Sequence, residues 1–555
     1  MPVEPSPVGL DSVGPVSSVP RATLLRPRGR HEVWLAELIV LIGAHTFSPH
    51  GSDAQTILPH GSDAHDDLIT GITLDSRLVA PGDLYVALPG RAHHGAEFAE
   101  GAVRAGAVAV LTDAAGGELT QNLPRPVVVV DNPRQVMGAV AARIYGQPSA
   151  RLTMLAVTGT NGKTTTSFLL DAALRAAGRH TGVIGTNGFL LDGVSLDATR
   201  TTVTTPESPE LQALLAVMVE GGADACVMEV SSHALVLGRA DAIVFDVAAF
   251  TNFGRDHLDF HGDEESYFEA KALLFTPERT RRALVNVDNP RGRQLAERVR
   301  TAGEVPLATM SLRASEADYA ATSIESGGAG RTRVMLRTPA RSVDFTLGLP
   351  GEFNVRNAIT ALAMLDICGV SLDRAAAALA TVQVPGRMQR VDLGPDAPAV
   401  YVDFAHTPQA VAAALEAVSG RRRVVVLGCG GDRDPDKRGP IGAAAASGAD
   451  VVVVTDDNPR YEDPVAIRAQ VLAGARAARN AEGLATEIMD GGDRRSAIRR
   501  GLEMARPGDV LVILGKGHEV GQEISGRVLP FSDVEVVRAE WARRIPSPDA
   551  QGGRQ

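Results

Sequence analysis

The sequence predicts an α/β protein of several domains, each built on a mainly parallel sheet. The chain has 555 residues, more than one hydrophobic core usually serves, so we expect about three or four domains. Near-continuous runs of Val and Leu recur along the chain, as is typical of parallel strands buried on both faces. Helical stretches alternate with these runs, which indicates repeated strand–helix–strand units.

Composition and charge exclude several classes of protein. Hydrophobic residues make up 44% and charged residues 22% of the chain, as in ordinary globular proteins. The net charge is −11, and no basic face with interleaved aromatics is present, so nucleic acid is not an expected partner. Three widely spaced cysteines without metal-ligand spacing favour a reducing, cytoplasmic compartment. The apolar runs are too short for a membrane span.

Residues 1–66 are expected to be a disordered extension and linker. They carry Pro, Ser and Arg without the apolar stretch of a secretory signal. The hexapeptide at residues 49–54 recurs at residues 59–64, which we interpret as a local duplication in a loop with solvated histidines. The remaining chain is divided into a first domain at 67–147, a second at 148–384, a third at 385–545 and a tail at 546–555.

The first domain is predicted to be a small α/β unit. Apolar runs at residues 84–88, 108–111 and 127–130 indicate strands, and residues 96–105 indicate a helix.

The second domain begins with a pattern typical of a phosphate site. A strand at residues 152–157 leads into Thr-Gly-Thr-Asn-Gly-Lys-Thr-Thr at 158–165, and a helix follows to about residue 177. Backbone N–H groups, the helix N-terminus and a lysine would then face an anion. Val157 stands where the general pattern has Gly, and the alternative is a Gly-rich turn that only caps a helix. The predicted phosphate-binding residues are Gly159, Thr160, Asn161, Gly162, Lys163, Thr164 and Thr165.

Further along the second domain lie candidate metal ligands. Glu229 ends an apolar run, and His257 follows the run at residues 243–250. Both would reach a cation near the phosphate loop, although Mg²⁺ prefers oxygen ligands and His257 alone favours a structural interpretation. No motif or spacing by itself indicates a function for Thr204, Thr205 or Lys271.

The third domain places three polar loops after three Val/Leu strands. The strands at residues 424–427, 451–454 and 510–514 lead into loops at 428–434, 455–460 and 515–519. If these strands are parallel neighbours, the loops share one edge of the sheet, where ligands bind. Arg pairs with a carboxylate and Asp or Glu with an ammonium, so a zwitterionic ligand fits. The alternative is three solvated turns, and Asp-Asn-Pro-Arg also occurs at 131–134 and 288–291 as a plain turn.

As an ordered set these motifs resemble the Mur ligases over about residues 67–545. The set consists of the phosphate loop, Glu-Val-Ser-Ser-His at 229–233, Tyr267 to Phe275 around Lys271, Gly351 to Asn357, Pro385 to Arg387, Asp403 to Pro408 and the three loops of the third domain. The resemblance implies a three-domain α/β architecture. It has a small UDP-binding N-terminal domain, a central P-loop ATPase-like domain and a Rossmann-like C-terminal domain.

The resemblance also implies how ATP and Mg²⁺ are bound. The phosphate loop would hold ATP, with Asn357, Arg387 and Asp403 as further nucleotide contacts. Thr164, Glu229 and His257 would serve Mg²⁺. Lys271 matches a lysine that this family carbamylates, and its carbamate would bind a second Mg²⁺. Lys163, Lys271 and His257 are the implied catalytic residues.

Substrate contacts are implied in all three domains. Leu74 and Ser76 match the uridine-nucleotide site, with Arg91 to His93 nearby. Thr204, Thr205, Ser231 and Arg239 match contacts to the rest of that substrate. The implied amino-acid site consists of Arg433, Asp457, Asn458, Pro459, Arg460, Gly515 and Glu519. The chain departs from the common pattern at His94, Val203, Leu237 and Phe404.

The function implied by the resemblance is an ATP-dependent amide ligase of peptidoglycan precursor synthesis, which serves cell-wall growth and division. It would add meso-diaminopimelate to UDP-MurNAc-L-Ala-D-Glu through an acyl phosphate, with Arg460 pairing the second carboxylate that lysine lacks. We expect a cytoplasmic monomer without membrane insertion. The alternatives are a lysine-adding ligase of the same family, a folylpolyglutamate synthetase, and a nucleotide-dependent regulatory protein that does not ligate.

Overall fold

A computed structural model describes residues 25–29, 31–43, 45–46, 55–57, 67–90, 92–197, 202, 204–327 and 330–544. The chain divides into two compact units, of which the first comprises mainly residues up to 146 and the second most of the remainder. Within the described residues, no helix is long and apolar enough to cross a bilayer. The sequence repeat at residues 49–64, apart from its central strand at 55–57, and the predicted tail at 546–555 lie outside the described residues.

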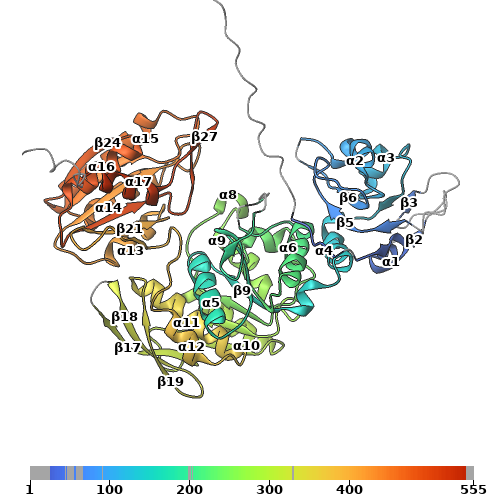
Figure 1. Cartoon of the computed structure of the whole chain (residues 1–555), viewed down its shortest axis with the longest axis horizontal. Helices are drawn as coiled ribbons and strands as arrows, with labels where there is room; N and C mark the ends of the chain where they lie inside the picture. Colours follow the sequence, from blue (N-terminus) through green and yellow to red (C-terminus); the bar gives the residue numbers. More distant parts are fainter. Residues whose placement is uncertain are drawn as a thin grey trace, which may run out of the picture. The chain divides into compact units, whose positions relative to one another are not determined.

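The first unit is built on a six-stranded mixed sheet, drawn in blue in Figure 1. Its strand order is β2-β3-β8-β7-β6-β5, and the strands from β8 to β5 run parallel. The strands are β2 (His45–Thr46), β3 (Gln55–Ile57), β5 (Gly71–Thr73), β6 (Asp83–Ala87), β7 (Ala109–Thr112) and β8 (Val127–Val129). The helices are α2 (Ala99–Ala105), α3 (Ala114–Leu119) and α4 (Pro133–Ile144), with a 3-10 turn at Gly95–Phe98. The predicted strands and helix of this region are confirmed.

Residues 33–41 correct the expectation of a disordered extension. They form β1 (Val33–Trp34), which pairs with β4 (Leu68–Ile69), and α1 (Leu35–Leu41). Leu35, Leu38 and Ile39 are buried in the core of the first unit because they recur on one face of the helix. Seven residues of helix are too few for the periodicity to stand out in the sequence.

The central part of the chain forms an eleven-stranded sheet. The order is β12-β11-β10-β13-β9-β14-β15-β16-β17-β18-β19, parallel from β10 to β17 and antiparallel at both ends. Its first strands are β9 (Thr153–Thr158), β10 (Thr181–Gly185), β11 (Gly188–Leu191), β12 (Val194–Ser195), β13 (Ala225–Glu229) and β14 (Val247–Phe250). They are followed by β15 (Ala283–Asn286), β16 (Leu307–Ser311), β17 (Tyr319–Ser326), β18 (Thr332–Arg337) and β19 (Ser342–Leu347).

One large core joins this sheet to the helices that cover it. Apolar side chains of β9 pack with those of α5 and α11, all essentially without solvent exposure. Helices α5 (Lys163–Ala176), α11 (Glu352–Ile367) and α12 (Leu372–Ala378) contribute to this core. The other helices of the central part are α6 (Ser208–Glu220), α7 (Ser232–Val236), α8 (Leu258–His261), α9 (Glu264–Ala272) and α10 (Pro290–Ala302), with 3-10 turns at Pro148–Arg151 and Leu273–Phe275. The core therefore fixes the strand end and the helix start between which the phosphate loop lies.

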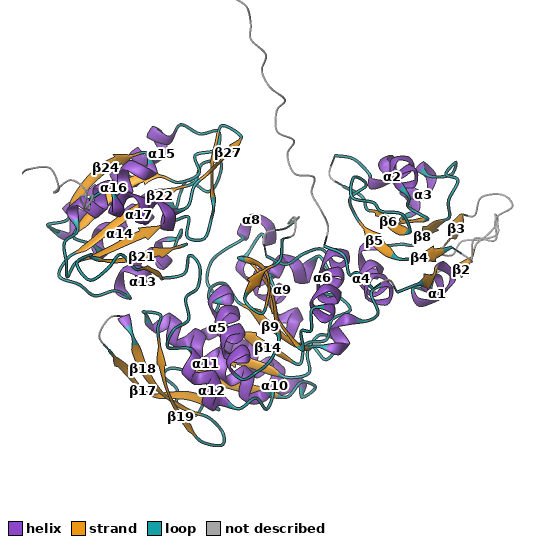
Figure 2. Ribbon diagram, in the orientation of Figure 1, coloured by secondary structure: helices purple, strands orange, loops and turns teal. Residues whose placement is uncertain are grey.

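The C-terminal part is a six-stranded sheet with helices on both faces (Figure 2). The order is β20-β21-β25-β22-β23-β24, and all but β20 are parallel. The strands are β20 (Gln389–Val391), β21 (Ala399–Asp403), β22 (Arg423–Cys429), β23 (Val451–Asp456), β24 (Glu487–Gly492) and β25 (Val510–Leu514). The helices α13 (Pro408–Glu416), α14 (Arg438–Gly448) and α15 (Pro464–Glu482) share one core, and α16 (Arg494–Met504) and α17 (Asp533–Ala542) share the other. A hairpin of β26 (Gly521–Ile524) and β27 (Arg527–Pro530) follows β25.

Candidate active site

The phosphate loop joins the end of β9 to the start of α5. Gly162 caps the helix with φ of +90°, and a Cβ at this position would collide with the side-chain oxygen of Asn357. Asn357 of α11 therefore lies against the loop, and its role as a nucleotide contact stays a prediction. The ammonium of Lys163 donates to the carbonyls of Gly159 (2.8 Å) and Thr160 (3.0 Å), and burial lowers its pKa. A phosphate group would offer this lysine stronger acceptors than two neutral carbonyls.

Oxygen donors converge behind the loop. Thr164 donates its hydroxyl to Glu229 Oε2 at 3.0 Å, and Thr186 donates both its N–H and its hydroxyl to the same carboxylate. Glu229 is 1% exposed, so these contacts compensate for the burial of its charge. A carboxylate and a hydroxyl beside phosphates fit Mg²⁺, which usually takes few protein ligands. Within the described residues, no group of three or more His, Cys, Asp or Glu side chains is arranged as a metal cage.

His257 lies in an aromatic cluster at the start of α8. Its backbone φ is +52°, and its ring lies 4.9 Å from that of His233 and 6.0 Å from that of Tyr267, measured between centroids. Its Nε2 lies 3.5 Å from Asp256. Burial lowers the pKa of His257 and, at His233, lowers it to about 4. Both rings are therefore neutral at neutral pH, but the predicted role of His257 as a metal ligand stays a prediction.

Lys271 is the buried cation that spacing alone did not single out. It is 1% exposed, its ammonium donates to the carbonyl of Gly159 at 3.0 Å, and it lies 4.3 Å from the centroid of the Tyr267 ring. Burial, helped by the charge of Lys163, holds the pKa of Lys271 well below its usual value. The side chain is therefore placed at the phosphate loop with an amine that loses its proton readily.

The residues predicted to contact the rest of the uridine-nucleotide substrate form one hydrogen-bond network with Glu229. Thr205 donates its hydroxyl to the Glu229 carbonyl at 2.9 Å and accepts from the Ser231 N–H at 3.2 Å. Arg239 donates to the Thr205 carbonyl at 3.3 Å and to Glu207 at 2.9 Å. Thr204 joins the network through the hydroxyl of Thr186 at 3.2 Å. Val203 lies outside the described residues.

Arg387 and Asp403 lie together beside Phe404. The guanidinium of Arg387 stands 4.6 Å from the centroid of the Phe404 ring, so the phenyl group found where Tyr is common still supplies a cation–π face. Asp403 accepts from the backbone N–H groups of Met388 (2.6 Å) and Ala405 (2.8 Å). Burial raises the pKa of Asp403 and lowers that of Arg387.

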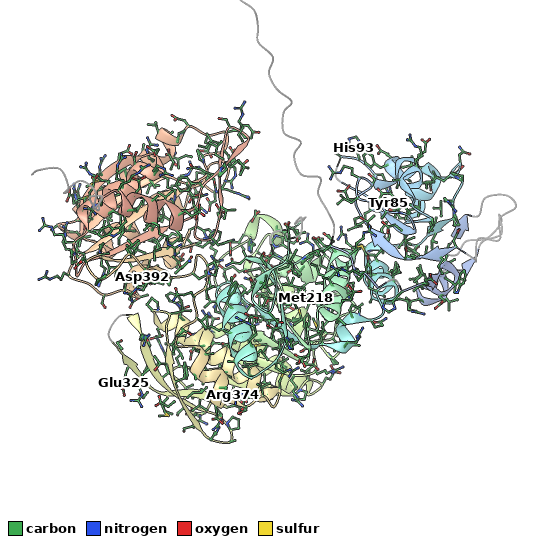
Figure 3. All side chains as sticks on the ribbon, viewed as in Figure 1. Tyr85, His93, Met218, Glu325, Arg374 and Asp392 are labelled. Atoms are coloured by element: carbon green, nitrogen blue, oxygen red, sulfur yellow. The ribbon has the colours of Figure 1, made fainter. Side chains whose placement is uncertain are left out.

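In the first unit, Leu74 and Ser76 lie in the loop after β5. Asp75 organises this loop by accepting from Arg77 through Nε (2.8 Å) and Nη2 (2.6 Å). Tyr85 of β6, labelled in Figure 3, donates to the Gly95 carbonyl at 2.9 Å, and burial raises its pKa to about 12. His94 contacts Asp113 at 3.0 Å, whereas Arg91 lies outside the described residues.

The three loops of the C-terminal sheet lie at one edge, as predicted, because β25, β22 and β23 are parallel neighbours. We call residues 428–434, 455–460 and 515–519 the edge loops. Lys516, fully buried, donates to Asn458 Oδ1 (3.0 Å) and to Glu519 Oε2 (2.8 Å). Asn458 in turn donates to Glu519 at 2.9 Å. Gly515 is required here because a Cβ would collide with the Asp457 carboxylate.

The pKa values of two carboxyl groups in the edge loops are shifted in opposite directions. Burial alone would raise the pKa of Glu519, but the ammonium of Lys516 and hydrogen bonds from Lys516 and Asn458 lower it. Burial raises the pKa of Asp457, which is 8% exposed. Arg433 is exposed, and the carbonyl of Pro459 accepts from the Glu462 N–H at 3.0 Å. Arg460 contacts the Gly431 carbonyl and Glu523.

Sequence reasoning missed the buried groups that hold the edge loops. Arg494 and Asp533 form a bidentate ion pair with no exposure, at 2.7 Å for each contact. Arg494 also donates to the carbonyls of Leu514 (3.0 Å) and Asp456 (3.4 Å), the last residues of β25 and β23. Lys516 lies within the predicted loop at residues 515–519, but no sequence signal points to Arg494, Asp533 or Glu523.

A phosphate loop on one parallel sheet and charged edge loops on a second define a multidomain nucleotide-binding protein. Family models match three segments: "Mur ligase family, catalytic domain" at residues 68–145, "Mur ligase middle domain" at 157–365 and "Mur ligase, glutamate ligase domain" at 386–517. The chain belongs to the Mur ligase family.

Relatives and a solved structure agree with this assignment. The chain is 47% identical over 478 residues to a UDP-N-acetylmuramoyl-L-alanyl-D-glutamate--2,6-diaminopimelate ligase of Streptomyces avermitilis, covering 85% of this chain and 92% of the relative. It is 46% identical over 490 residues to a protein of the same name from Corynebacterium glutamicum, covering 86% and 93%. A solved structure of that name matches with a TM-score of 0.63 and 31% identity, covering 93% of this chain and 99% of that one.

Proposed function

We propose that the chain is an ATP-dependent amide ligase that adds meso-diaminopimelate to UDP-MurNAc-L-Ala-D-Glu. The names of the relatives support the reaction, and the observation that carries it in this chain is the set of edge loops. There, Arg460, Asn458 and Glu519 offer a guanidinium, an amide and a carboxylate within one hydrogen-bonded group. Such a group suits an amino acid with an additional carboxylate.

The reaction has two steps that split one difficult condensation. The D-Glu carboxylate attacks the γ-phosphorus of ATP, an O–P bond forms, the bond to the β-phosphate breaks, and ADP leaves. The amine of the amino acid then attacks the acyl carbon, a C–N bond forms, the acyl C–O bond breaks, and phosphate leaves after the nitrogen loses a proton. Lys163 would turn from its loop carbonyls to the transferred phosphoryl group, whose charge it offsets.

Mg²⁺, when bound, would offset the repulsion between carboxylate and triphosphate. Thr164 and Glu229 are the oxygen donors that would hold it, with His257 as a further proposed ligand. Lys271 is proposed to be carbamylated: its neutral amine would take up CO₂ and release a proton, so a buried cation would become an oxygen-donor anion. A carbon-13 signal from labelled bicarbonate that persists in Lys271→Ala would rule this out.

Selection between diamino acids is assigned to Arg460. Lysine lacks the second carboxylate, so it would forgo the contact with the guanidinium that meso-diaminopimelate makes. Lysine addition remains the alternative reaction. Phosphate release should be measured with meso-diaminopimelate, lysine and glutamate in turn, each with ATP, Mg²⁺ and the UDP-linked dipeptide. We expect release with meso-diaminopimelate alone.

The same assay on Arg460→Ala tests the role of that residue. We expect kcat/KM for meso-diaminopimelate to fall by about 10²-fold or more, because a ligand charge would be left unpaired. Equal rates with lysine in the parent protein would overturn the assigned specificity.

We further propose that the domains end near residues 147, 384 and 545 and that the protein is a monomer. A cytoplasmic location fits the use of ATP and the free thiols of Cys226, Cys368 and Cys429. Sedimentation of the purified chain and fractionation of cells test these two statements.

A further inference from the structure

The guanidinium of Arg460 is held from two sides by residues outside its own loop. Its Nε donates to Glu523 Oε2 at 3.1 Å, and its Nη1 donates to the Gly431 carbonyl at 2.7 Å. A guanidinium has five N–H groups, so within the described residues these contacts use two of them. The remaining three include both N–H groups of Nη2, which are available for a ligand carboxylate.

The hairpin that carries Glu523 also fixes the backbone of this loop. The Arg460 N–H donates to the Glu523 carbonyl at 3.0 Å, and the Ser525 N–H donates to the Arg460 carbonyl at 2.7 Å. The Glu523 N–H donates to Asn458 Oδ1 at 3.0 Å. These contacts hold Arg460 at a φ of +52°, which is unfavourable for a residue with a side chain. Glu523 thus binds the edge loops through its N–H, its carbonyl and its carboxylate.

We infer that Glu523 is a positioning residue that sets selectivity for the second carboxylate of the incoming amino acid by orienting Arg460. The inference rests on the proposed function. A long arginine side chain loses rotational freedom when it binds a ligand, and the bond from Nε to Glu523 imposes that order beforehand. The carboxylate of Glu523 must then act on the ligand in two opposed ways.

Orientation of Arg460 favours the ligand carboxylate, whereas the charge of Glu523 repels it. The side chains of Arg460 and Glu523 are 21% and 36% exposed, so solvent screens the repulsion. The directional hydrogen bond is less affected by screening, and orientation therefore dominates while Arg460 is present. Without Arg460, only the repulsion remains. Removal of the Glu523 carboxylate should consequently weaken binding of the amino acid in the parent protein and strengthen it in Arg460→Ala.

The test compares Glu523→Ala in the parent protein and in Arg460→Ala. In the parent, we expect KM for meso-diaminopimelate to rise about tenfold, as for the loss of a hydrogen bond to a charged group. The kcat and the KM for ATP should stay within about twofold of the parent values, because the substitution does not change the phosphate loop. In the Arg460→Ala background, kcat/KM should instead increase by about two- to threefold, as expected for a screened repulsion.

Two further variants separate positioning from loss of structure. Glu523→Gln keeps an acceptor for Nε without the charge, so KM should rise by only about threefold. Asp344→Asn is the matched control, because Asp344 pairs with Arg333 across the exposed β18–β19 hairpin of the central sheet; it should leave KM unchanged. Melting temperatures check that all variants fold. If Glu523→Ala unfolds, Glu523→Gln replaces it in the comparison of the parent protein with Arg460→Ala.

Four outcomes are decisive. The same sign of effect in both backgrounds, or an unchanged KM in Glu523→Ala and Glu523→Gln, would overturn the inference alone, since the parent enzyme would still add meso-diaminopimelate. A parent protein that does not ligate meso-diaminopimelate would overturn the proposed function and the inference with it. Calorimetric titration of meso-diaminopimelate should reproduce the change in KM, and a binding constant that does not follow KM would also contradict positioning.

Discussion

The phosphate loop and the edge loops achieve ligand binding in different ways. The phosphate loop is a single continuous segment, residues 158–165, that runs from the end of one strand into the start of one helix. The edge loops come from three strands and depend on Lys516, Arg494 and a hairpin that lies up to 65 residues away in sequence from the loop it holds. A site formed by one continuous segment can be recognised from its sequence motif. A site formed by several separate loops can be recognised only when the strand order is known.

The comparison predicts that a change in the phosphate loop affects chemistry and not stability. Lys163→Met should lower kcat by about 10³-fold or more, because a charge that offsets the transferred phosphoryl group is lost. The melting temperature should stay within about 2 °C of the parent, since the ammonium binds only two loop carbonyls. Rapid-quench measurement of ADP formation, with a melting curve as control, checks both. Unchanged ADP formation would remove Lys163 from the mechanism.

A change beneath the edge loops should affect stability as well as binding. Arg494→Ala leaves Asp533 buried and unpaired, so we expect a loss of about 3–5 kcal/mol in the free energy of unfolding. Urea denaturation followed by fluorescence measures it. The double variant Arg494→Met with Asp533→Leu should recover much of this loss, but KM for the amino acid should stay raised, because the ends of β23 and β25 lose their shared donor. A double variant with a normal KM would show that Arg494 contributes to stability and not to binding of the amino acid.

The smallest effect is expected at Asp457, a buried residue of the edge loops. Burial raises the pKa of this carboxyl, so its ionised form destabilises the folded protein. The penalty is complete above the folded pKa and absent below the ordinary value of 3.8, where both states are protonated. Asp457→Asn should therefore raise the melting temperature at pH 7 by about 2 °C or more. The gain should disappear as the pH approaches 3.8. Scanning calorimetry at several pH values measures this, and a gain that grows at low pH would contradict the assigned sign.

Much of the architecture was accessible from the sequence, for reasons that differ between elements. The strands β22, β23 and β25 are apolar runs buried on both faces, and parallel order then brings their loops to one edge. The helix α1 was missed because seven residues give too little periodicity. Arg494 and Glu523 were missed because their roles depend on contacts 20 to 65 residues away, which no local pattern encodes. The placement of Lys271 at the phosphate loop is likewise a contact across 112 residues.

The most direct test of the account supplies the purified protein with ATP, Mg²⁺, UDP-MurNAc-L-Ala-D-Glu and meso-diaminopimelate and follows the product by mass spectrometry. The account predicts a peptide heavier by one meso-diaminopimelate less one water, with one ADP formed for each peptide extended. ADP formation without extension of the peptide would contradict it.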